Sequence, residues 1–210
     1  MSSAFSVGLT GGVGSGKSTI AAMLAACGAG IVDADAISHE LTQAGGAAIP
    51  AMRATFGDQA IAADGSLDRT HMRSRAFSDP AVRLELESLL HPLIRTEMGK
   101  RAFETTTAGW PYVVFVIPLL VESGSKIDAM RRVLLIDCSK ATQLARVRAR
   151  PAMSETMARD IIGAQATRQQ RLAVADDVLM NEAPLTEIRP RVELLHQTYL
   201  ECARSTYAAT

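Results

Sequence analysis

Residues 8–19, GLTGGVGSGKST, place five glycines beside Lys17 and the adjacent hydroxyl side chains of Ser18 and Thr19, directly after a run of apolar residues. Glycine in the interior of a helix or strand is destabilising, so this density of glycine needs a reason. Within the run, Gly11-x-x-x-x-Gly16-Lys17-Ser18 matches the phosphate-loop pattern Gly-x4-Gly-Lys-[Ser/Thr] without a mismatch. Residues without a Cβ let successive backbone N–H groups turn inward around an anion, and the helix that follows adds its partial positive charge. We therefore predict that residues 11–18, the phosphate loop, bind a nucleoside triphosphate.

The side chains of the phosphate loop have separate expected roles. Lys17 is predicted to reach the β- and γ-phosphates, and the hydroxyl of Ser18 is predicted to bind Mg²⁺. The remaining contacts come from the loop backbone and the first helical turn. We assign nucleotide binding to Gly12, Val13, Gly14, Ser15, Gly16, Lys17, Ser18 and Thr19.

A pair of carboxylates follows the second apolar run, in Val32-Asp33-Ala34-Asp35. If this segment is extended, both side chains point to the same face, whereas a helix that begins at Asp35 separates them. Phosphoryl transfer to a hydroxyl needs one carboxylate that orients the hydroxyl and accepts its proton. Two interpretations stay open at this point: a carboxylate contacts the acceptor hydroxyl, or Asp35 only caps the helix that follows it.

Arginines cluster in two later segments, Arg146-Val-Arg-Ala-Arg150-Pro151 and Gln165-Ala-Thr-Arg-Gln-Gln-Arg171. On a helix, Arg146 and Arg150 share one face while Arg148 points nearly opposite. Such charges are commonly solvated, but a triphosphate site raises the alternative of a lid whose arginine folds over the transferring phosphate. For Arg168 and Arg171 in the second segment, helix-surface charge is the simpler interpretation.

Two single residues complete the candidates. His91 precedes Pro92, and we expect it to pack or cap rather than to catalyse. Glu122 follows the apolar run that ends at Leu120, and it either holds a water on Mg²⁺ or caps a helix. The four histidines show no paired ligand spacing, so a metal site built from protein side chains alone is not indicated.

The candidate residues have to be positioned by helices and strands. Short apolar runs, which are candidate strands, alternate with helical patterns along the chain. The runs are rich in Val, Ile and Leu, as parallel strands covered on both faces should be. They span residues 4–10, 30–34, 112–119, 132–138 and 176–181. The alternation predicts right-handed crossovers and a three-layer α/β/α sandwich with a five-stranded parallel sheet. Its ligand site is expected at the carboxyl ends of the strands, where the phosphate loop lies.

A long interval, about 36–111, separates the second and third apolar runs. The pair Asp79-Pro80 predicts the start of a helix that continues to Leu90. We expect the pre-proline His91 to interrupt it, with a second helix from Leu93 to about Phe103. Such a helical insertion at the sheet edge is well placed to hold a second substrate, although it can also be a plain structural addition.

Length and composition bound the class of protein. The chain has 210 residues, which favours a single domain, and its 22 basic and 22 acidic residues balance, which argues against a nucleic-acid partner. Three cysteines without a Cys-x-x-Cys suggest a reduced cytoplasmic setting. No signal-peptide pattern is present, and the strongest apolar run, residues 113–121, is too short to span a bilayer. We expect a cytoplasmic protein that binds neither nucleic acid nor membrane.

Further motifs narrow the class of nucleotide-binding protein. The chain lacks the guanine-binding Asn-Lys-x-Asp of regulatory GTPases and the Leu-Ser-Gly-Gly-Gln of transporter ATPases. A small-molecule kinase remains the best interpretation, with a nucleotide-binding switch as the alternative.

Five segments in a fixed order resemble the dephospho-CoA kinase family over essentially the whole chain. They are Leu9–Thr19, Asp33-Ala-Asp35, His91-Pro-Leu-Ile94, Pro118-Leu-Leu-Val-Glu122 and Gln165–Asp177. The resemblance implies a P-loop kinase that uses ATP and Mg²⁺ to phosphorylate the ribose 3′-hydroxyl of dephospho-CoA, the last step of coenzyme A synthesis. It implies ATP and dephospho-CoA as the small-molecule substrates, and we predict no obligate protein partner.

The resemblance also implies roles for segments and residues. The expected core is about 1–35, 108–140 and 172–210, the CoA-binding insertion is about 36–107, and the lid is about 141–171. We expect the insertion to contact the pantetheine and diphosphate arms of the acceptor. Catalytic roles fall on Asp35 as the family's proposed base, on Lys17, and on Arg146 as the lid arginine. Acceptor-site roles fall on Thr10, Asp33, Asp35 and His91. One departure is Asn181-Glu-Ala-Pro184, where the family often has Asn-x-Gly to help seat the adenine.

Overall fold

The computed structural model describes residues 5–122, 130–151 and 153–208. These residues form two compact units. The helical unit comprises residues 33–101, and the core unit comprises the described parts of 1–32 and 102–210. Each unit has its own apolar cluster.

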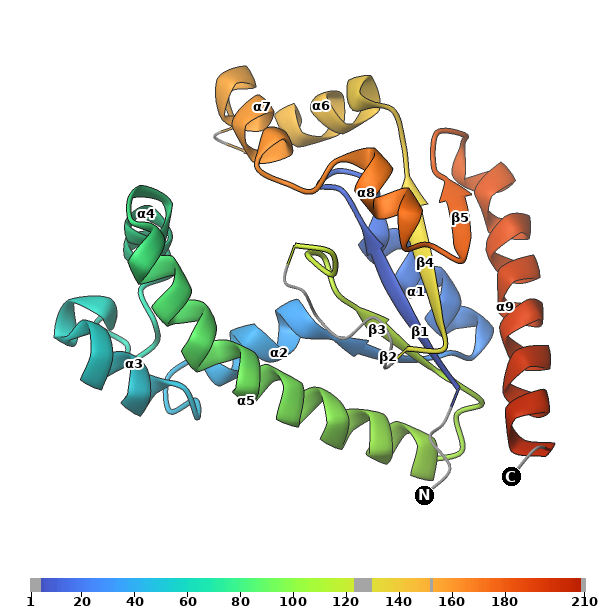
Figure 1. Ribbon diagram of the computed structural model, residues 1–210, viewed down its shortest axis with the longest axis horizontal. Helices are drawn as coiled ribbons and strands as arrows, with labels where there is room; N and C mark the ends of the chain where they lie inside the picture. Colours follow the sequence, from blue (N-terminus) through green and yellow to red (C-terminus); the bar gives the residue numbers. More distant parts are fainter. Residues whose placement is uncertain (1–4, 123–129, 152, 209–210) are drawn as a thin grey trace. The chain divides into compact units, whose positions relative to one another are not determined.

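The core unit is built on one sheet. Its strands are β1 (Ser6–Gly11), β2 (Gly30–Asp33), β3 (Val113–Val116), β4 (Arg132–Asp137) and β5 (Asp177–Met180). They lie in the order β2-β3-β1-β4-β5, which Figure 1 shows. β1 pairs in parallel with β3 and with β4, and β4 pairs in parallel with β5. The predicted five-stranded parallel sheet is therefore confirmed. β1 is central, which explains why all of its residues are buried.

Five helices surround this sheet or lie at its end. They are α1 (Lys17–Cys27), α6 (Lys140–Arg148), α7 (Glu155–Gly163), α8 (Arg168–Ala173) and α9 (Leu185–Ala208). α1 and α9 pack against each other, and their apolar side chains join those of the strands in one core. α6, α7 and α8 gather at the carboxyl ends of β1 and β4 (Figure 1). α6 ends at Arg148, so Arg150 lies beyond the helix on which we expected it beside Arg146.

The helical unit contains α2 (Ala34–Leu41), α3 (Ile49–Phe56), α4 (Arg69–Ser78) and most of α5 (Pro80–Thr107). A short 3₁₀ turn, Asp58–Ala60, follows α3. Met52, Phe56 and Met72 form the centre of the apolar cluster of this unit. Burial of each such side chain stabilises the unit by roughly 1.5–3 kcal/mol relative to an exposed one.

The interruption that we expected at His91 is wrong. α5 is continuous from Pro80 to Thr107, with Pro92 inside it. The helix starts as predicted, since the Asp79 carboxylate accepts from the N–H of Ala81 at 2.8 Å. A proline removes one backbone hydrogen bond and crowds the preceding turn. Here the leucines before Pro92 and Leu93 after it pack against the same apolar cluster, so burial on both sides offsets that loss.

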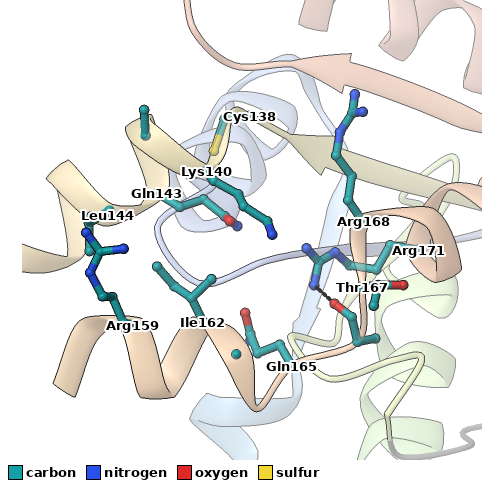
Figure 2. A pocket seen from close by; sticks show the side chains of 13 residues that line it. Cys138, Lys140, Gln143, Leu144, Arg159, Ile162, Gln165, Thr167, Arg168 and Arg171 are labelled. Atoms are coloured by element: carbon teal, nitrogen blue, oxygen red, sulfur yellow. Dashed lines mark hydrogen bonds between the residues drawn. The ribbon is translucent and has the colours of Figure 1, made fainter. Parts of the chain in front are cut away.

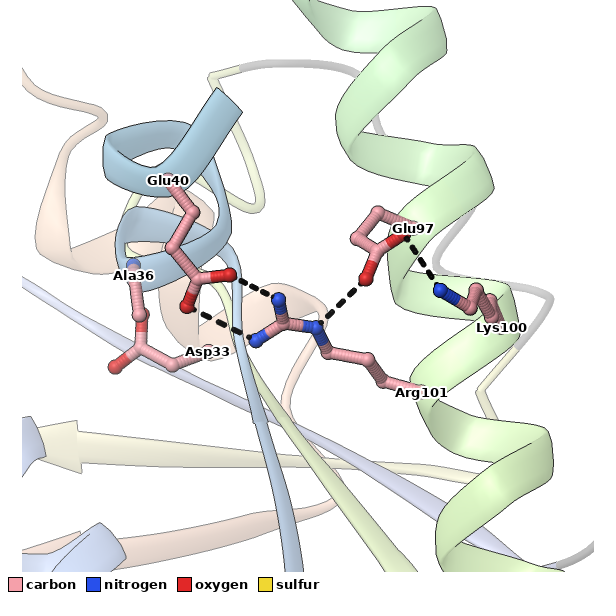
Figure 3. Close-up of polar contacts among 6 residues, drawn as sticks. All are labelled: Asp33, Ala36, Glu40, Glu97, Lys100 and Arg101. Carbon is pink, nitrogen blue, oxygen red and sulfur yellow. Dashed lines mark hydrogen bonds and ion pairs between the residues drawn. The ribbon is translucent and has the colours of Figure 1, made fainter. Parts of the chain in front are cut away.

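Within the helical unit, an ion-pair network joins α2 to α5 (Figure 3). Both terminal nitrogens of Arg101 donate to the carboxylate of Glu40, and Nε donates to Glu97 at 3.0 Å. Lys100 is 3.8 Å from the other oxygen of Glu97. The hydrogen bonds from Arg101 hold the pKa of Glu40 below its ordinary value. A bidentate pair of this kind fixes the orientation of both side chains.

Candidate active site

The phosphate loop links β1 to α1 through a backbone that only glycine can follow at several positions. Gly14 and Gly16 have φ of 75° and 93°, in the left-handed region that disfavours side chains. A Cβ at Gly16 would also collide with Nδ2 of Asn181, and one at Gly12 would collide with Nε2 of Gln143. The glycines therefore serve both the turn and the close approach of neighbouring side chains.

The start of α1 fits the binding of an anion. Gly16 is the N-cap, and within the described residues no side chain caps the first turn. An uncapped helix start presents backbone N–H groups and a partial positive charge to a ligand. The Ser15 hydroxyl is buried without a hydrogen-bond partner in the described part of the chain, and the Ser18 and Thr19 side chains are exposed. These donors suit nucleotide phosphates, and the Ser18 hydroxyl suits a hard cation such as Mg²⁺.

Lys17 lies back over the loop. Its Nζ donates to the carbonyl oxygens of Gly11 at 2.7 Å and Gly12 at 3.1 Å. The ammonium is therefore held at the rim of the turn that carries the backbone donors. This position agrees with the role that we predict for Lys17 at the phosphates.

Two side chains from distant parts of the sequence brace the phosphate loop from the outside. The Arg146 guanidinium donates to the carbonyl oxygens of Gly14 (3.3 Å), Ser15 (3.4 Å) and Asn181 (2.9 Å). Asn181 is buried and its side-chain amide donates to Ser15 O at 2.7 Å. Arg148 instead pairs with Glu155 at 3.0 Å, on the opposite side of α6 as the helical spacing predicted.

The segment before α8 contacts the loop as well. The backbone N–H of Val13 donates to Oε1 of Gln165 at 2.7 Å. The N–H of Ala166 donates to Oε1 of Glu122 at 2.7 Å, so this carboxylate holds the start of the α8 segment. A role for Glu122 on a Mg²⁺-bound water stays a prediction. Thr10 is fully buried beneath the loop, and its hydroxyl donates over a long 3.5 Å to Pro118 O.

A cavity of about 500 Å³ lies between α6, α7 and the start of α8 (Figure 2). Its polar lining includes Lys140, Gln143, Arg159, Gln165, Arg168 and Arg171, and it has no acidic lining residue. Arg168 bonds the buried carboxylate of Asp137 at 2.7 Å, and Arg159 bonds Glu155 at 2.7 Å. Arg171 is buried rather than exposed, so the helix-surface interpretation of this residue is wrong.

The remaining predicted residues belong to the helical unit. Asp33 is the N-cap of α2, and its Oδ1 accepts from the N–H groups of Asp35 at 2.8 Å and Ala36 at 3.1 Å. The interpretation in which Asp35 caps this helix is therefore wrong, because the helix begins one residue before Asp35 and Asp33 takes that role. His91 is half-buried within α5. Roles for Asp33, Asp35 and His91 toward an acceptor stay predictions.

Comparison with known proteins identifies the family. The sequence profile of the dephospho-CoA kinase family matches residues 5–187. A dephospho-CoA kinase from Dechloromonas aromatica is 48% identical over 208 residues, which cover 99% of each chain. The chain belongs to the dephospho-CoA kinase family.

Solved structures share the fold of the chain. The structure of TT1252 from Thermus thermophilus matches 91% of the chain and 96% of its own length with a TM-score of 0.79 and 28% identity. A dephospho-CoA kinase from Campylobacter jejuni matches 93% of the chain and 97% of its own length with a TM-score of 0.68 and 22% identity, which supports the fold. In the described part of the chain, none of the helices combines the length and apolar character needed to cross a bilayer.

For this member of the dephospho-CoA kinase family, the sequence did not indicate several residues at the loop. Asn181 was considered only for the adenine, whereas its side chain braces Ser15. Gln143 carries no charge and lies in none of the motifs, so no local signal marks it, and Gln165 opens a segment of the resemblance but was given no role of its own. Arg171 lies in a segment that carries the resemblance, but its burial depends on tertiary packing.

Proposed function

We propose that the chain transfers the γ-phosphate of ATP to the ribose 3′-hydroxyl of dephospho-CoA, giving coenzyme A and ADP. The observation that carries the proposal is the glycine turn with Lys17 at its rim, in a chain of the dephospho-CoA kinase family. Phosphoryl transfer needs little covalent chemistry from the protein, so positioning and charge stabilisation account for most of the catalysis.

On the donor side, the loop backbone and the first turn of α1 bind the β- and γ-phosphates, and Lys17 supplies a compact positive charge there. The Ser18 hydroxyl would hold Mg²⁺, which would supply neutralisation of charge on the phosphate oxygens. Ser15, buried and unpartnered within the described residues, adds a hydroxyl donor inside the same turn. These assignments rest on backbone geometry and on exposed hydroxyls at the helix start.

For the transfer itself, we assign the proton of the acceptor hydroxyl to Asp35. Support comes from its match to the family's proposed base and from the finding that Asp33, not Asp35, caps α2. Arg146 stabilises the charge on the transferring phosphate as the lid arginine, with residues 141–171 as the lid. Its guanidinium donates to two carbonyl oxygens of the phosphate loop, so this cation lies beside the loop.

The acceptor is the larger substrate, and we assign its binding to the insertion, about 36–107, together with Thr10, Asp33 and His91. We also propose that the enzyme acts in the cytoplasm on ATP and dephospho-CoA alone, without an obligate protein partner.

The experiment that tests this function measures ADP release from Mg²⁺-ATP with and without dephospho-CoA. Rapid release is expected only with the acceptor, because water is poorly placed to attack when the acceptor does not organise the site. Phosphorus NMR should place the new phosphate on the 3′ oxygen of the product. Adenosine carries the reacting hydroxyl but lacks the binding arms, so it should be a much poorer acceptor. A higher kcat/KM with shikimate, gluconate or a nucleoside monophosphate would contradict the proposed acceptor and leave the kinase assignment intact.

A further inference from the structure

Arg171 is a buried cation for which the described part of the chain supplies no ion-paired carboxylate. Its side chain lines the cavity between α6, α7 and the start of α8, and the residue is only 7% exposed. Nη1 donates to the carbonyl oxygen of Ala166 at 2.6 Å, and Nε is buried with no acceptor in the described part of the chain. Buried charges are normally paired, since desolvation of an isolated ion is strongly unfavourable. A guanidinium held in this state points to an anion that is not part of the protein.

The other arginines of the cavity make the contrast clear. Arg168 is bonded to Asp137, and Arg159 is bonded to Glu155. Arg171 and the exposed Lys140 pair with no carboxylate among the described residues, and no aspartate or glutamate lines the cavity. Two positive charges in one acid-free cavity therefore remain available for a ligand. Guanidinium and ammonium groups are the usual partners of phosphate oxygens.

The cavity borders the phosphate loop. A Cβ on Gly12 would lie 3.2 Å from Nη2 of Arg171 and would collide with the amide of Gln143, which also lines the cavity. Gln165, another lining residue, accepts from the N–H of Val13. Figure 2 shows Lys140, Gln143 and Arg171 pointing toward one another. The two unpaired cations thus lie next to the loop that we assign to the donor phosphates.

The volume and chemistry of the cavity indicate which anion it takes. About 500 Å³ is the size of a small-molecule pocket and exceeds what one phosphate group fills. The triphosphate of the donor already has the loop. The acceptor carries a diphosphate on the same ribose as its reacting hydroxyl, so a hydroxyl at the loop brings this diphosphate within one sugar of it.

We propose that Arg171, with Lys140, binds the diphosphate of the acceptor in this cavity of the core unit. The assignment rests on the proposed function, and it moves the diphosphate contacts from the insertion, where we first expected them, to the lid helices. Arg171 is then a residue that selects acceptors by their diphosphate, and Lys140 adds a second, more exposed charge.

Steady-state kinetics of four proteins test the proposal: wild type, Arg171→Gln, Lys140→Gln and the control Arg148→Gln. Arg171→Gln should raise the KM for dephospho-CoA by about 10- to 100-fold, the range for a hydrogen bond to a charged group. Lys140→Gln should raise it by about 2- to 5-fold, since an exposed charge contributes less. Arg148→Gln, whose guanidinium pairs with Glu155 outside the cavity lining, should leave it unchanged. The KM for ATP should stay constant in all four.

A second acceptor distinguishes diphosphate binding from general damage. Adenosine has no diphosphate, so its low kcat/KM should be the same for wild type and Arg171→Gln. An equal fall on both acceptors would overturn the proposal, because it would place Arg171 at the reacting groups or in the structure.

The other outcomes are also decisive. A raised KM for ATP alone would assign the cavity to the donor. A stabilisation of wild type by inorganic phosphate that Arg171→Gln abolishes, with an unchanged KM for dephospho-CoA, would make the cavity a free-phosphate site. If Arg171→Gln does not fold by circular dichroism, an unchanged KM in Lys140→Gln overturns the proposal. Wild type that does not phosphorylate dephospho-CoA at all would refute the proposed function instead.

Discussion

The phosphate loop and the cavity beside it both present positive potential to phosphate groups, but they do so by different means. The loop uses backbone N–H groups and the start of α1, packed so closely that a Cβ at Gly12 or Gly16 would displace a neighbouring side-chain amide. The cavity uses side-chain cations, Lys140 from α6 and Arg171 from α8. Backbone donors have to be consecutive in the sequence, whereas side-chain donors need only converge in the folded chain. A motif therefore reveals the first kind of site and not the second.

The two regions should also differ in what they bind. A backbone cradle fits any triphosphate, and its selectivity is for phosphate alone. Side chains at the ends of separate helices are better suited to one particular acceptor. Variants of the loop should consequently act on the donor and on turnover, and variants of the cavity should act on the acceptor.

The largest effect is expected for Asp35, the proposed proton acceptor, which belongs to neither the phosphate loop nor the cavity. Asp35→Asn should lower kcat by roughly 10²- to 10⁴-fold, because asparagine cannot accept a proton. Its ATP affinity and its melting temperature should stay at wild-type values, since the loop is untouched and Asp35 does not cap α2. Kinetics at saturating substrates, together with thermal melting, check this.

Asp33→Ala is the matched control for Asp35→Asn. It removes the side chain that caps α2, so it should reduce the free energy of unfolding by about 1 kcal/mol. If Asp35→Asn destabilises the protein as Asp33→Ala does and turns over normally when folded, Asp35 is a structural residue.

Arg146→Ala should have the next largest effect. An arginine over a transferring phosphate contributes about 10³-fold or more to kcat. Arg146 also braces the loop carbonyls, so its loss should weaken ATP binding too, which links the loop to the helices around the cavity. Arg148→Ala is the control on the same helix, because its guanidinium pairs with Glu155 instead. Equal and small effects at both positions would show that Arg146 does not stabilise the transferring phosphate and is only a structural contact of the loop.

The contrast between loop and cavity also explains what the sequence could predict. Five parallel strands, the loop and the helix after it follow from patterns that are local in the chain. The capping role of Asp33 was missed because α2 starts two residues earlier than a helix capped by Asp35 would. The continuity of α5 through Pro92 and the burial of Arg171 were missed because both depend on packing between segments distant in sequence.

Lys17→Ala tests the loop alone. Removal of this point charge should lower kcat by about two to three orders of magnitude, the range for loss of one electrostatic stabiliser. The fold should persist, because Lys17 lies at the rim of the loop and outside the apolar core of the unit. The KM for dephospho-CoA should change little. A normal melting temperature with near wild-type turnover would remove the basis for the phosphate-loop assignment.

Gly12→Ala tests how closely the loop and the cavity wall are packed. The added methyl group has to displace the amide of Gln143, so the free energy of unfolding should fall by about 1–3 kcal/mol. Gln143→Ala removes that amide, and the double variant should lose less than the sum of the two single losses. A coupling of at least about 0.5 kcal/mol is expected for residues in contact. Strict additivity in chemical denaturation would show that the two regions are independent here.

The smallest effect concerns His196, a core residue outside both regions. Its protonation should make the free energy of unfolding depend on pH independently of the site. Burial lowers the pKa of His196, and its Nδ1 lies 2.8 Å from the buried hydroxyl of Tyr112. A histidine whose pKa is lower in the folded chain binds fewer protons there, so protonation favours unfolding. The contribution of neutral His196 to the free energy of unfolding should be fully present above the unfolded pKa of about 6.5 and should decline as the pH falls below it.

His196→Asn keeps a polar group near Tyr112 but cannot titrate in this range. Its free energy of unfolding should be lower than that of wild type at pH 7, because the smaller side chain leaves a gap. Between pH 7 and 5 this free energy should also change less with pH than that of wild type. The wild-type slope from one proton cannot exceed about 1.4 kcal/mol per pH unit. Denaturation at several pH values measures both slopes. Equal slopes in the two proteins would assign the acid sensitivity to a carboxylate or to another histidine rather than to His196.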